Sequence, residues 1–186
     1  MIGYAFCGSF CTHAASLAQL RALVAAGEDV LPILSHNVYT TDTRFGRAAD
    51  LLQELEKITG RAAVCSIVDA EPLGPKTPLE LLIISPCTGN TLAKMAHGIT
   101  DTPVTMAAKA HLRADRPLLI ALASNDALSA NLGNLAALAM RKSVYFVPMR
   151  QDDPQGKPHS LVADFSLLPA ALSAAREARQ LRPMFL

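Results

Sequence analysis

The sequence contains no run of about 18 apolar residues, the length that a membrane-spanning helix needs. Residues 1–10 also lack the basic stretch and apolar core that open a secretory signal peptide. Lysine and arginine number 17 against 16 for aspartate and glutamate, and no basic block stands out. These absences predict a soluble, cytoplasmic protein with little electrostatic reason to bind nucleic acid or a membrane surface.

Cysteine is scarce, with four residues in the chain, and no two of them have the CxxC spacing. No group of histidines and cysteines has the spacing of a zinc site. We therefore expect no metal centre. The thiols are expected to be reduced and either buried or close to a binding site, at Cys7, Cys11, Cys65 and Cys87.

Strand-like and helix-like patterns alternate along the whole chain. Of the 186 residues, 51% are hydrophobic, which is enough for one sizeable core. Apolar runs predict strands at residues 2–6, 30–34, 63–68, 81–84, 117–123 and 144–147. Helical spacing predicts helices between most of them and at residues 167–181, and a polar loop is expected at 151–159. The sequence thus predicts a single α/β domain, residues 1–186, built on a doubly wound, mostly parallel sheet.

Small polar residues follow four of these predicted strands. They are Gly8-Ser9, Ser35, the segment 85–91 and Ser124-Asn125-Asp126. In a parallel doubly wound sheet, ligands bind at the carboxyl ends of the strands, so these turns are expected to meet at one site. Gly8 allows the backbone to approach a ligand and Ser9 offers a hydroxyl at a helix start, which suits a phosphate. Neither the GxGxxG nor the GxxxxGK[ST] motif is present, so no dinucleotide or nucleoside triphosphate is indicated.

Several of these segments resemble a known family. Gly8-Ser9, Ser35 and the run PCTGNTLAKMAHGITD at 86–101 are similar to the FMN-binding flavoproteins that include phosphopantothenoylcysteine decarboxylase and flavin prenyltransferase. The resemblance implies a flavodoxin-like, Rossmann-like three-layer fold and FMN as cofactor. It also implies trimers, or assemblies of trimers, with the flavin near a protomer boundary.

The resemblance also implies a set of flavin contacts. Gly8, Ser9 and Ser35 would bind the phosphate, although an ordinary turn-and-cap role is the alternative for each. Asn90 would bond the ring or a substrate carboxylate, or would only cap its helix. The full set implied is Gly8, Ser9, Phe10, Ser35, Pro86, Cys87, Thr88, Gly89, Asn90, Thr91 and Ser124.

A narrower group within that family matches longer stretches. GSFCTH near the start, SPCTGNTLAKMAHGITDTPVTMAAKAHLR in the middle and PMRQDDPQGKPHSLVAD near the end resemble flavoprotein subunits that serve spore formation. The resemblance implies a subunit that works with a second, NAD(P)-dependent-looking A subunit to convert a dihydropyridine dicarboxylate to pyridine-2,6-dicarboxylate. We therefore expect an oxidoreductase subunit whose flavin accepts a hydride from a small dicarboxylate substrate.

The departures from the decarboxylases and prenyltransferases bear on the alternatives. The chain has no tryptophan, and residues 62–78 lack the histidine that the decarboxylases carry near the third strand. Residues 123–126 read Ala-Ser-Asn-Asp, where the prenyltransferases have Arg-Glu-Thr-Pro. Both activities are therefore disfavoured. They stay open as alternatives, together with a non-catalytic subunit that binds flavin or stabilises its partner.

A dianionic substrate requires fixed positive charge near these segments. The candidates are Lys109, Arg113, Arg150 and Lys157. Arg150 is favoured because it follows a strand directly and a guanidinium can hold a carboxylate with two parallel hydrogen bonds. With Asn90 and Asn125, Arg150 completes the expected catalytic set.

Two further polar residues have structural roles in this prediction. Asp101 is expected to pair with Lys94 or to cap the helix that starts at Thr102. His13, a lone histidine at a helix start, is expected to be partly buried and hydrogen-bonded rather than a general acid or base.

Overall fold

The computed structural model describes residues 1–186 and contains one mixed sheet of seven strands. In chain order the strands are β1 (Ile2–Phe6), β2 (Val30–Leu34), β3 (Leu81–Cys87), β4 (Leu118–Ser124), β5 (Val144–Phe146), β6 (Met149–Arg150) and β7 (Leu161–Ala163). Their order across the sheet is β2-β1-β3-β4-β7-β6, and β5 pairs with the first half of β4. β1 to β5 pair in parallel, whereas β6 and β7 form an antiparallel hairpin on the end of β4. The predicted doubly wound, mostly parallel sheet is confirmed.

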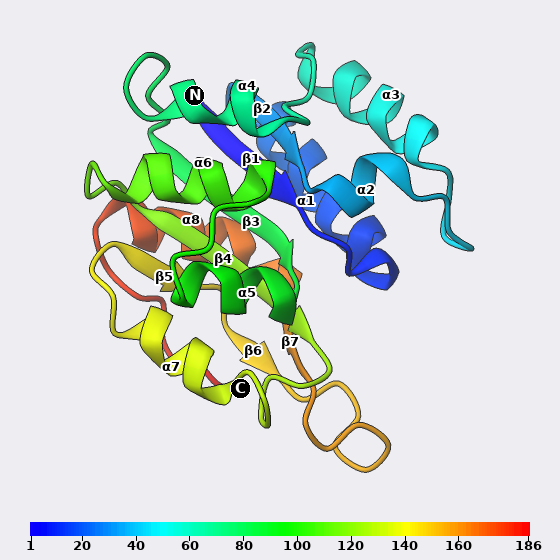
Figure 1. The fold of residues 1–186 in the computed structure, drawn as a ribbon. Helices are drawn as coiled ribbons and strands as arrows, with labels where there is room; N and C mark the ends of the chain where they lie inside the picture. The colour runs from blue at the N-terminus through cyan, green and yellow to red at the C-terminus, as the bar shows by residue number, and fades with distance from the viewer.

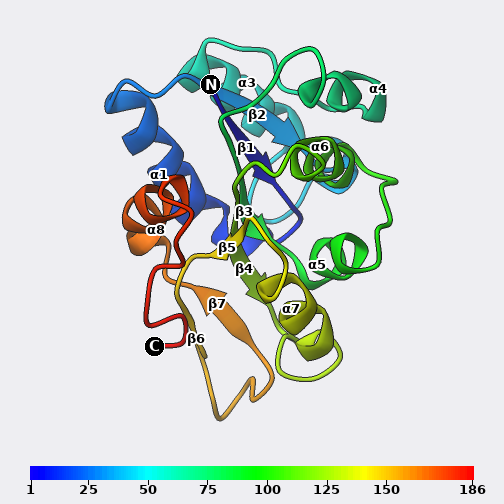
Figure 2. The same cartoon turned by 90° about the vertical axis from the view of Figure 1, so that its left-hand side faces the viewer.

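Helices cover both faces of the sheet, which gives three layers (Figures 1 and 2). They are α1 (His13–Ala25), α2 (His36–Thr40), α3 (Ala48–Thr59), α4 (Ile67–Ala70), α5 (Gly89–Ala96), α6 (Pro103–Leu112), α7 (Leu132–Ala139) and α8 (Leu168–Arg176). α1 and α8 lie on one side in Figure 2, and α4 to α7 lie on the other. No helix combines the length and the apolar character that crossing a membrane requires.

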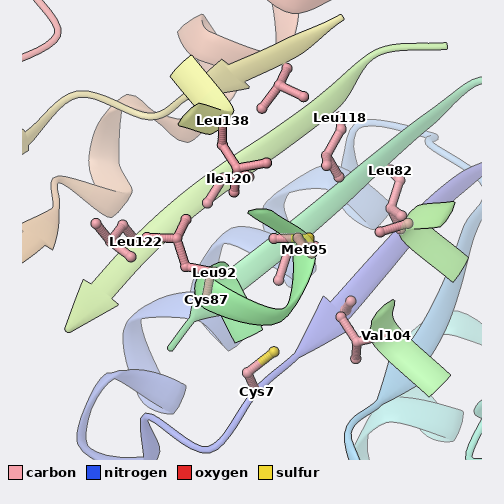
Figure 3. Packing of buried hydrophobic residues seen from close by; sticks show 14 of the residues in the cluster. Cys7, Leu82, Cys87, Leu92, Met95, Val104, Leu118, Ile120, Leu122 and Leu138 are labelled. Carbon is pink, nitrogen blue, oxygen red and sulfur yellow. The ribbon is translucent and has the colours of Figure 1, made fainter. Parts of the chain in front are cut away.

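Side chains of the central strands alternate between two cores because successive residues of a strand point to opposite faces. Tyr4 and Phe6 of β1 pack in the cluster beneath α1 and α8. Ala5 and Cys7 pack in the other cluster, which Figure 3 shows beneath α5. Every residue of β1, β3 and β4 is buried, as expected for parallel strands covered on both faces. The apolar runs in the sequence therefore identify the centre of the sheet.

An irregularity near the end of β3 changes this alternation. The register of β3 against β4 shifts between Ile84 and Cys87. Ile84 and Cys87, three residues apart, consequently face the same core, where strict alternation would send them to opposite faces. β3 also continues three residues beyond the predicted strand at 81–84.

A buried hydrogen-bond network ties β1, β3 and α1 together. The Tyr4 hydroxyl donates to the carbonyl of Ser16 at 3.0 Å and lies 3.1 Å from the hydroxyl of Ser85. The Ser16 hydroxyl donates to the carbonyl of Ser85 at 2.6 Å. All three residues have no exposed surface, and burial raises the pKa of Tyr4 to about 12. The network fixes where α1 lies against the two central strands.

Some predicted elements differ from the structure. The strand predicted at 63–68 is wrong: only Val64 bridges Ile33, because Ser66 instead caps α4 by accepting from Asp69 N–H. The terminal helix predicted at 167–181 ends at Arg176. The short helix α2 was not expected, nor was the β6–β7 hairpin that carries the predicted polar loop at 151–159.

The outer side of β6 is covered by the segment Met184 to Leu186. Met149 N–H donates to the carbonyl of Met184, and Leu186 N–H donates to the carbonyl of Met149, both at 2.9 Å. Phe185 forms a parallel bridge with Met149. The short strand β6 is therefore paired on both sides.

Tyr4→Phe should lower the free energy of unfolding by about 1–3 kcal/mol, because it removes one member of a buried, satisfied network. Urea denaturation followed by circular dichroism measures this change. Tyr145→Phe is the matched control: Tyr145 is only partly buried and its hydroxyl forms no hydrogen bond, so a change below about 0.5 kcal/mol is expected. Equal effects of the two substitutions would contradict a stabilising role for the network.

Candidate functional site

A cleft of about 1090 Å³ lies at the carboxyl ends of the strands. Its walls come from the connections that follow β1, β2, β3 and β4 and from the loop between β6 and β7. The chain adds strands in opposite directions on either side of the β1/β3 boundary, and that topological switch point is where open α/β sheets bind ligands. Three of the four polar turns predicted to converge, those after β1, β3 and β4, line this one cleft.

The connection after β1 offers groups suited to an anion. Gly8, Ser9 and Phe10 all line the cleft. The backbone N–H of Gly8 donates to no acceptor in the chain. The Ser9 hydroxyl accepts from the Thr12 hydroxyl at 3.2 Å, and its nearest other partner is the Cys11 sulfur at 4.0 Å, a long contact that a ligand oxygen can replace. An unpaired backbone amide and a weakly bonded hydroxyl therefore lie next to each other in the chain at the switch point.

Ser35 lies at the end of β2, next to the same turn. Its N–H donates to the carbonyl of Phe6 at 3.0 Å, so it adjoins the end of β1. Its hydroxyl does not cap α2 and forms no other hydrogen bond in the chain. Ser35 is buried and does not line the cleft, unlike Ser9.

The connection after β3 divides the predicted contacts into two groups. Thr88, Gly89 and Asn90 line the cleft at the start of α5. Thr91 is turned inward, where its hydroxyl donates to the Cys7 sulfur at 3.3 Å. Pro86 and Cys87 belong to β3 and are buried, so the structure does not bring them to the cleft.

Thr88 caps α5, and this leaves Asn90 free. The Thr88 hydroxyl accepts from Thr91 N–H at 3.2 Å. The exposed Asn90 side chain forms no hydrogen bond, so the capping alternative for Asn90 is wrong. The first amides of α5 also have no acceptor within the helix. Asn90 therefore presents an unused donor and acceptor to the cleft.

Beyond β4, a polar cluster supports the cleft wall. The hydroxyl of Ser124 donates to Asp126, whose other oxygen accepts from the Asn131 side chain at 2.9 Å. Ser124 thus lines the cleft with its own proton already used. The exposed Asn125 also lines the cleft and makes no side-chain hydrogen bond, as at Asn90. Nothing in the sequence spacing indicated the bonds of Asp126 to Ser124 and Asn131.

The β6–β7 loop forms the far wall and is braced internally. Lys157 pairs with Asp152 at 2.8 Å, and Asp152 also accepts from the Ser160 hydroxyl at 2.7 Å. These bonds hold the pKa of Asp152 below its usual range and raise the pKa of Lys157. Leu128 N–H donates to the carbonyl of His159, which attaches the loop to the connection after β4. Lys157 is therefore a charged group held at the cleft.

Arg150 lies elsewhere. It pairs with Asp164 and lines a separate concavity of about 440 Å³ between α1 and the hairpin. Asp152 borders both concavities, but Arg150 does not line the larger cleft. The position of Arg150 in this chain therefore does not support the carboxylate-clamp role that was expected for it.

Three further titratable groups, His13, Cys7 and Asp101, have structural roles. His13 is buried, with Nε2 2.8 Å from the carbonyl of Cys7, and burial lowers its pKa. Burial also raises the pKa of Cys7 to about 11, so its thiol is neutral at physiological pH. All four cysteines are free, and Cys11 is the exposed one. Lys94 pairs with Asp101 at 2.8 Å, and Thr102 caps α6, which settles both alternatives for Asp101.

Comparison with known proteins gives one family. The family model described as Flavoprotein matches residues 13–163. The B subunit of dipicolinate synthase from Bacillus subtilis (strain 168) is 45% identical over 183 residues, which are 98% of this chain and 92% of that protein. The B subunit of dipicolinate synthase from Bacillus halodurans superposes with a TM-score of 0.91 at 43% identity, covering 100% of this chain and 95% of that one.

A more distant solved structure shares the fold. DmrB of Burkholderia xenovorans, solved in complex with FMN, superposes with a TM-score of 0.69 at 21% identity and covers 92% of both chains. At this identity the similarity concerns the architecture alone.

Gly89→Ala should disturb the cleft wall, because an added Cβ would lie 2.5 Å from Ser124 Oγ and 2.7 Å from atoms of Asp126 and Asn131. We expect the free energy of unfolding to fall by about 1–3 kcal/mol, measured by urea denaturation. Gly133→Ala on α7 is the control, because a Cβ there meets nothing within 4 Å. It should stabilise the protein by about 0.4–1 kcal/mol. If Gly89→Ala leaves the free energy of unfolding unchanged, α5 does not pack tightly against Ser124, Asp126 and Asn131.

Proposed function

The chain belongs to the flavoprotein family, and from that premise we propose that it binds FMN and forms dipicolinate together with an A subunit. The observation that carries the proposal is the 45% identity to the B subunit of a dipicolinate synthase over 98% of the chain. Dipicolinate is pyridine-2,6-dicarboxylate, and the reaction would oxidise a dihydrodipicolinate-type precursor during sporulation.

The cleft fits a flavin nucleotide in size and in the groups that it offers. Its volume of about 1090 Å³ is slightly above the usual range for small-molecule sites, roughly 300–1,000 Å³, which leaves room for a cofactor together with a small substrate. The Gly8 amide and the Ser9 hydroxyl line one end of the cleft and suit a phosphate, and Ser35, buried behind them at the end of β2, has a hydroxyl without a partner in the chain. Asn90 and Asn125 stand further along with free amide groups, which suit the polar edge of a ring. These residues would hold FMN from its phosphate to its ring.

When bound, FMN supplies the redox chemistry by accepting a hydride, while the substrate also loses a proton and becomes aromatic. The residues that line the cleft form no recognisable acid–base–nucleophile set. Its own residues therefore act by orienting the two rings and by balancing charge. Asn90 and Asn125 would position the reacting ring, since both side chains are free to bond it.

The substrate carries two carboxylates, and Lys157 is the cation that we assign to one of them. Of the four cations considered from the sequence, Lys157 alone lines the cleft, whereas Arg150 lines the other concavity. Lys157 remains 54% exposed in its pair with Asp152, so its ammonium group can still donate to a ligand. We therefore assign the carboxylate contact to Lys157 and not to Arg150.

We also propose a homo-oligomer, a trimer or an assembly of trimers, located in the cytoplasm. The A subunit is the expected partner because the chain has no nicotinamide-binding fingerprint of its own. Decarboxylase and prenyltransferase activities are less well supported, since the cysteine decarboxylase SpaF is only 24% identical and superposes with a TM-score of 0.68. A non-catalytic role in stabilising the A subunit is the remaining alternative, and turnover distinguishes it.

Purified protein should take up FMN at micromolar concentration and show flavin absorption bands that bleach reversibly on reduction. Fluorescence titration of the folded apoprotein measures the affinity. A folded sample that does not bind FMN would contradict the proposal directly.

The chain and its A subunit together should convert the precursor to dipicolinate, and Lys157→Gln should raise KM about tenfold with the FMN affinity unchanged. The physical reason is the loss of one charge-assisted hydrogen bond to the substrate. Absorbance of the product gives the rates, and fluorescence titration gives the flavin affinity.

Arg150→Gln is the matched control for Lys157→Gln, and it should leave KM unchanged. If KM rises for Arg150→Gln but not for Lys157→Gln, Arg150 and not Lys157 binds the substrate carboxylate. If the A subunit alone forms dipicolinate as fast as the pair, the catalytic role proposed for this chain is wrong.

A further inference from the structure

We infer that the turn Arg44-Phe45, which no sequence motif identified, binds the phosphate end of the cofactor. The inference rests on the proposed binding of FMN and adds a residue that selects a phosphomonoester over an uncharged end. Only two permanent cations line the cleft, Arg44 and Lys157.

The turn itself is closed by hydrogen bonds. Thr43 N–H donates to the carbonyl of Gly46 at 3.0 Å, and Gly46 N–H donates to the carbonyl of Thr43 at 3.1 Å. Phe45 N–H donates to the Thr43 hydroxyl at 3.1 Å. Gly46 has a φ of 146°, a conformation that other residues rarely adopt. Arg44 and Phe45 therefore stand at the tip of a defined turn rather than on a loose loop.

Arg44 has no carboxylate partner, in contrast to its neighbours. Arg47, three residues further on, pairs with Asp50 at 2.6 Å. Lys157 across the cleft pairs with Asp152. The guanidinium of Arg44 instead lies 4.9 Å from the centre of the Phe45 ring, and that ring is 53% exposed. The guanidinium of Arg44 thus faces an aromatic ring, and none of its N–H groups has a hydrogen-bond partner in the chain.

The position of the turn assigns Arg44 to the phosphate end. The turn follows β2, which is the edge strand next to β1, and the Gly8-Ser9 turn follows β1. Figure 1 shows the α2–α3 connection on the same side of the molecule as the start of α1. The β6–β7 loop with Lys157 lies beyond β4, so β2 and β7 are four strand spacings apart, about 19 Å. A ligand that extends from phosphate to ring can span this row, so the two cations would meet different ends of it.

The chemistry of the two ends agrees with this order. The Gly8 amide and Ser9 hydroxyl are neutral donors, so they leave the charge of a phosphate dianion unbalanced. A guanidinium supplies that balance and can bond two phosphate oxygens at once. Arg44 would complete the phosphate site, and Lys157 would remain for the substrate.

The experiment compares the dissociation constants of FMN and riboflavin by fluorescence titration of the full-length apoprotein at low and high salt. The variants are Arg44→Ala and Arg44→Lys, with Arg47→Ala as the matched control on the same exposed segment. Arg44→Ala should weaken FMN about tenfold and leave riboflavin unchanged. Arg44→Lys should restore part of the preference for FMN over riboflavin. A lysine keeps the positive charge but cannot form the two parallel hydrogen bonds of a guanidinium. The preference of the wild type for FMN should shrink in high salt, and that of Arg44→Ala should change less.

Arg47→Ala should bind both flavins as the wild type does. Equal weakening of FMN and riboflavin by Arg44→Ala, or no change in either, would overturn the inference. A wild-type protein that binds neither flavin would instead contradict the proposed function, so the two failures are distinguishable.

Discussion

The buried network of Tyr4, Ser16 and Ser85 is the constraint on which the site depends. Each of its three residues comes from a different element, β1, α1 and β3, and each hydroxyl is completely removed from water. Buried hydroxyls are tolerated only when they are paired, so α1 cannot slide or rotate against the strands without leaving one unsatisfied. The Gly8-Ser9 turn lies between β1 and α1, and the Thr88 turn directly follows the end of β3. The buried network therefore fixes the distance between these two turns across the switch point, although none of its three residues lines the cleft.

At the rim of the cleft, local bonding decides which polar side chains remain for a ligand. Thr88 uses its hydroxyl to cap α5, and Ser124 donates its proton to Asp126. Asn90 and Asn125 stand beside them with no partner in the chain. A hydroxyl that satisfies a helix end or a carboxylate is a structural group even when it faces the cleft. The division between scaffold and ligand contacts thus follows from the hydrogen bonds of adjacent residues and not from residue type.

The sequence predicted the parts of this molecule that depend on local pattern. The buried strands were recognisable because parallel strands covered on both faces are apolar throughout, and Gly8, Ser9 and Asn90 were placed at the site because strand ends share one edge. The strand at 63–68 was wrong because Ser66 satisfies the backbone of a helix start, which competes with strand pairing. Thr91 and Cys87 were expected at the cleft, but Thr91 lies on the buried side of α5 and Cys87 follows a register shift in β3 that turns it into the core. The turn containing Asp126 was placed at the site, but the positions of Arg44 and of the β6–β7 hairpin at the cleft depend on how distant segments pack, and no single-sequence pattern encodes that packing.

The pairing of Met184 to Leu186 with Met149 also governs how this molecule meets others. An open β6 would present a row of unpaired amides and carbonyls, and such an edge is a template for strand addition by another chain. Here the protein fills that row with its own backbone, with hydrogen bonds on both sides of Met149. The opposite edge of the sheet is β2, whose Pro32 has no amide to donate and whose outer side bonds to Val64 at both Pro32 and Leu34. The two strands that end the main strand order, β2 and β6, thus both bond on their outer sides to backbone of the same chain, which disfavours strand addition by another copy at these edges.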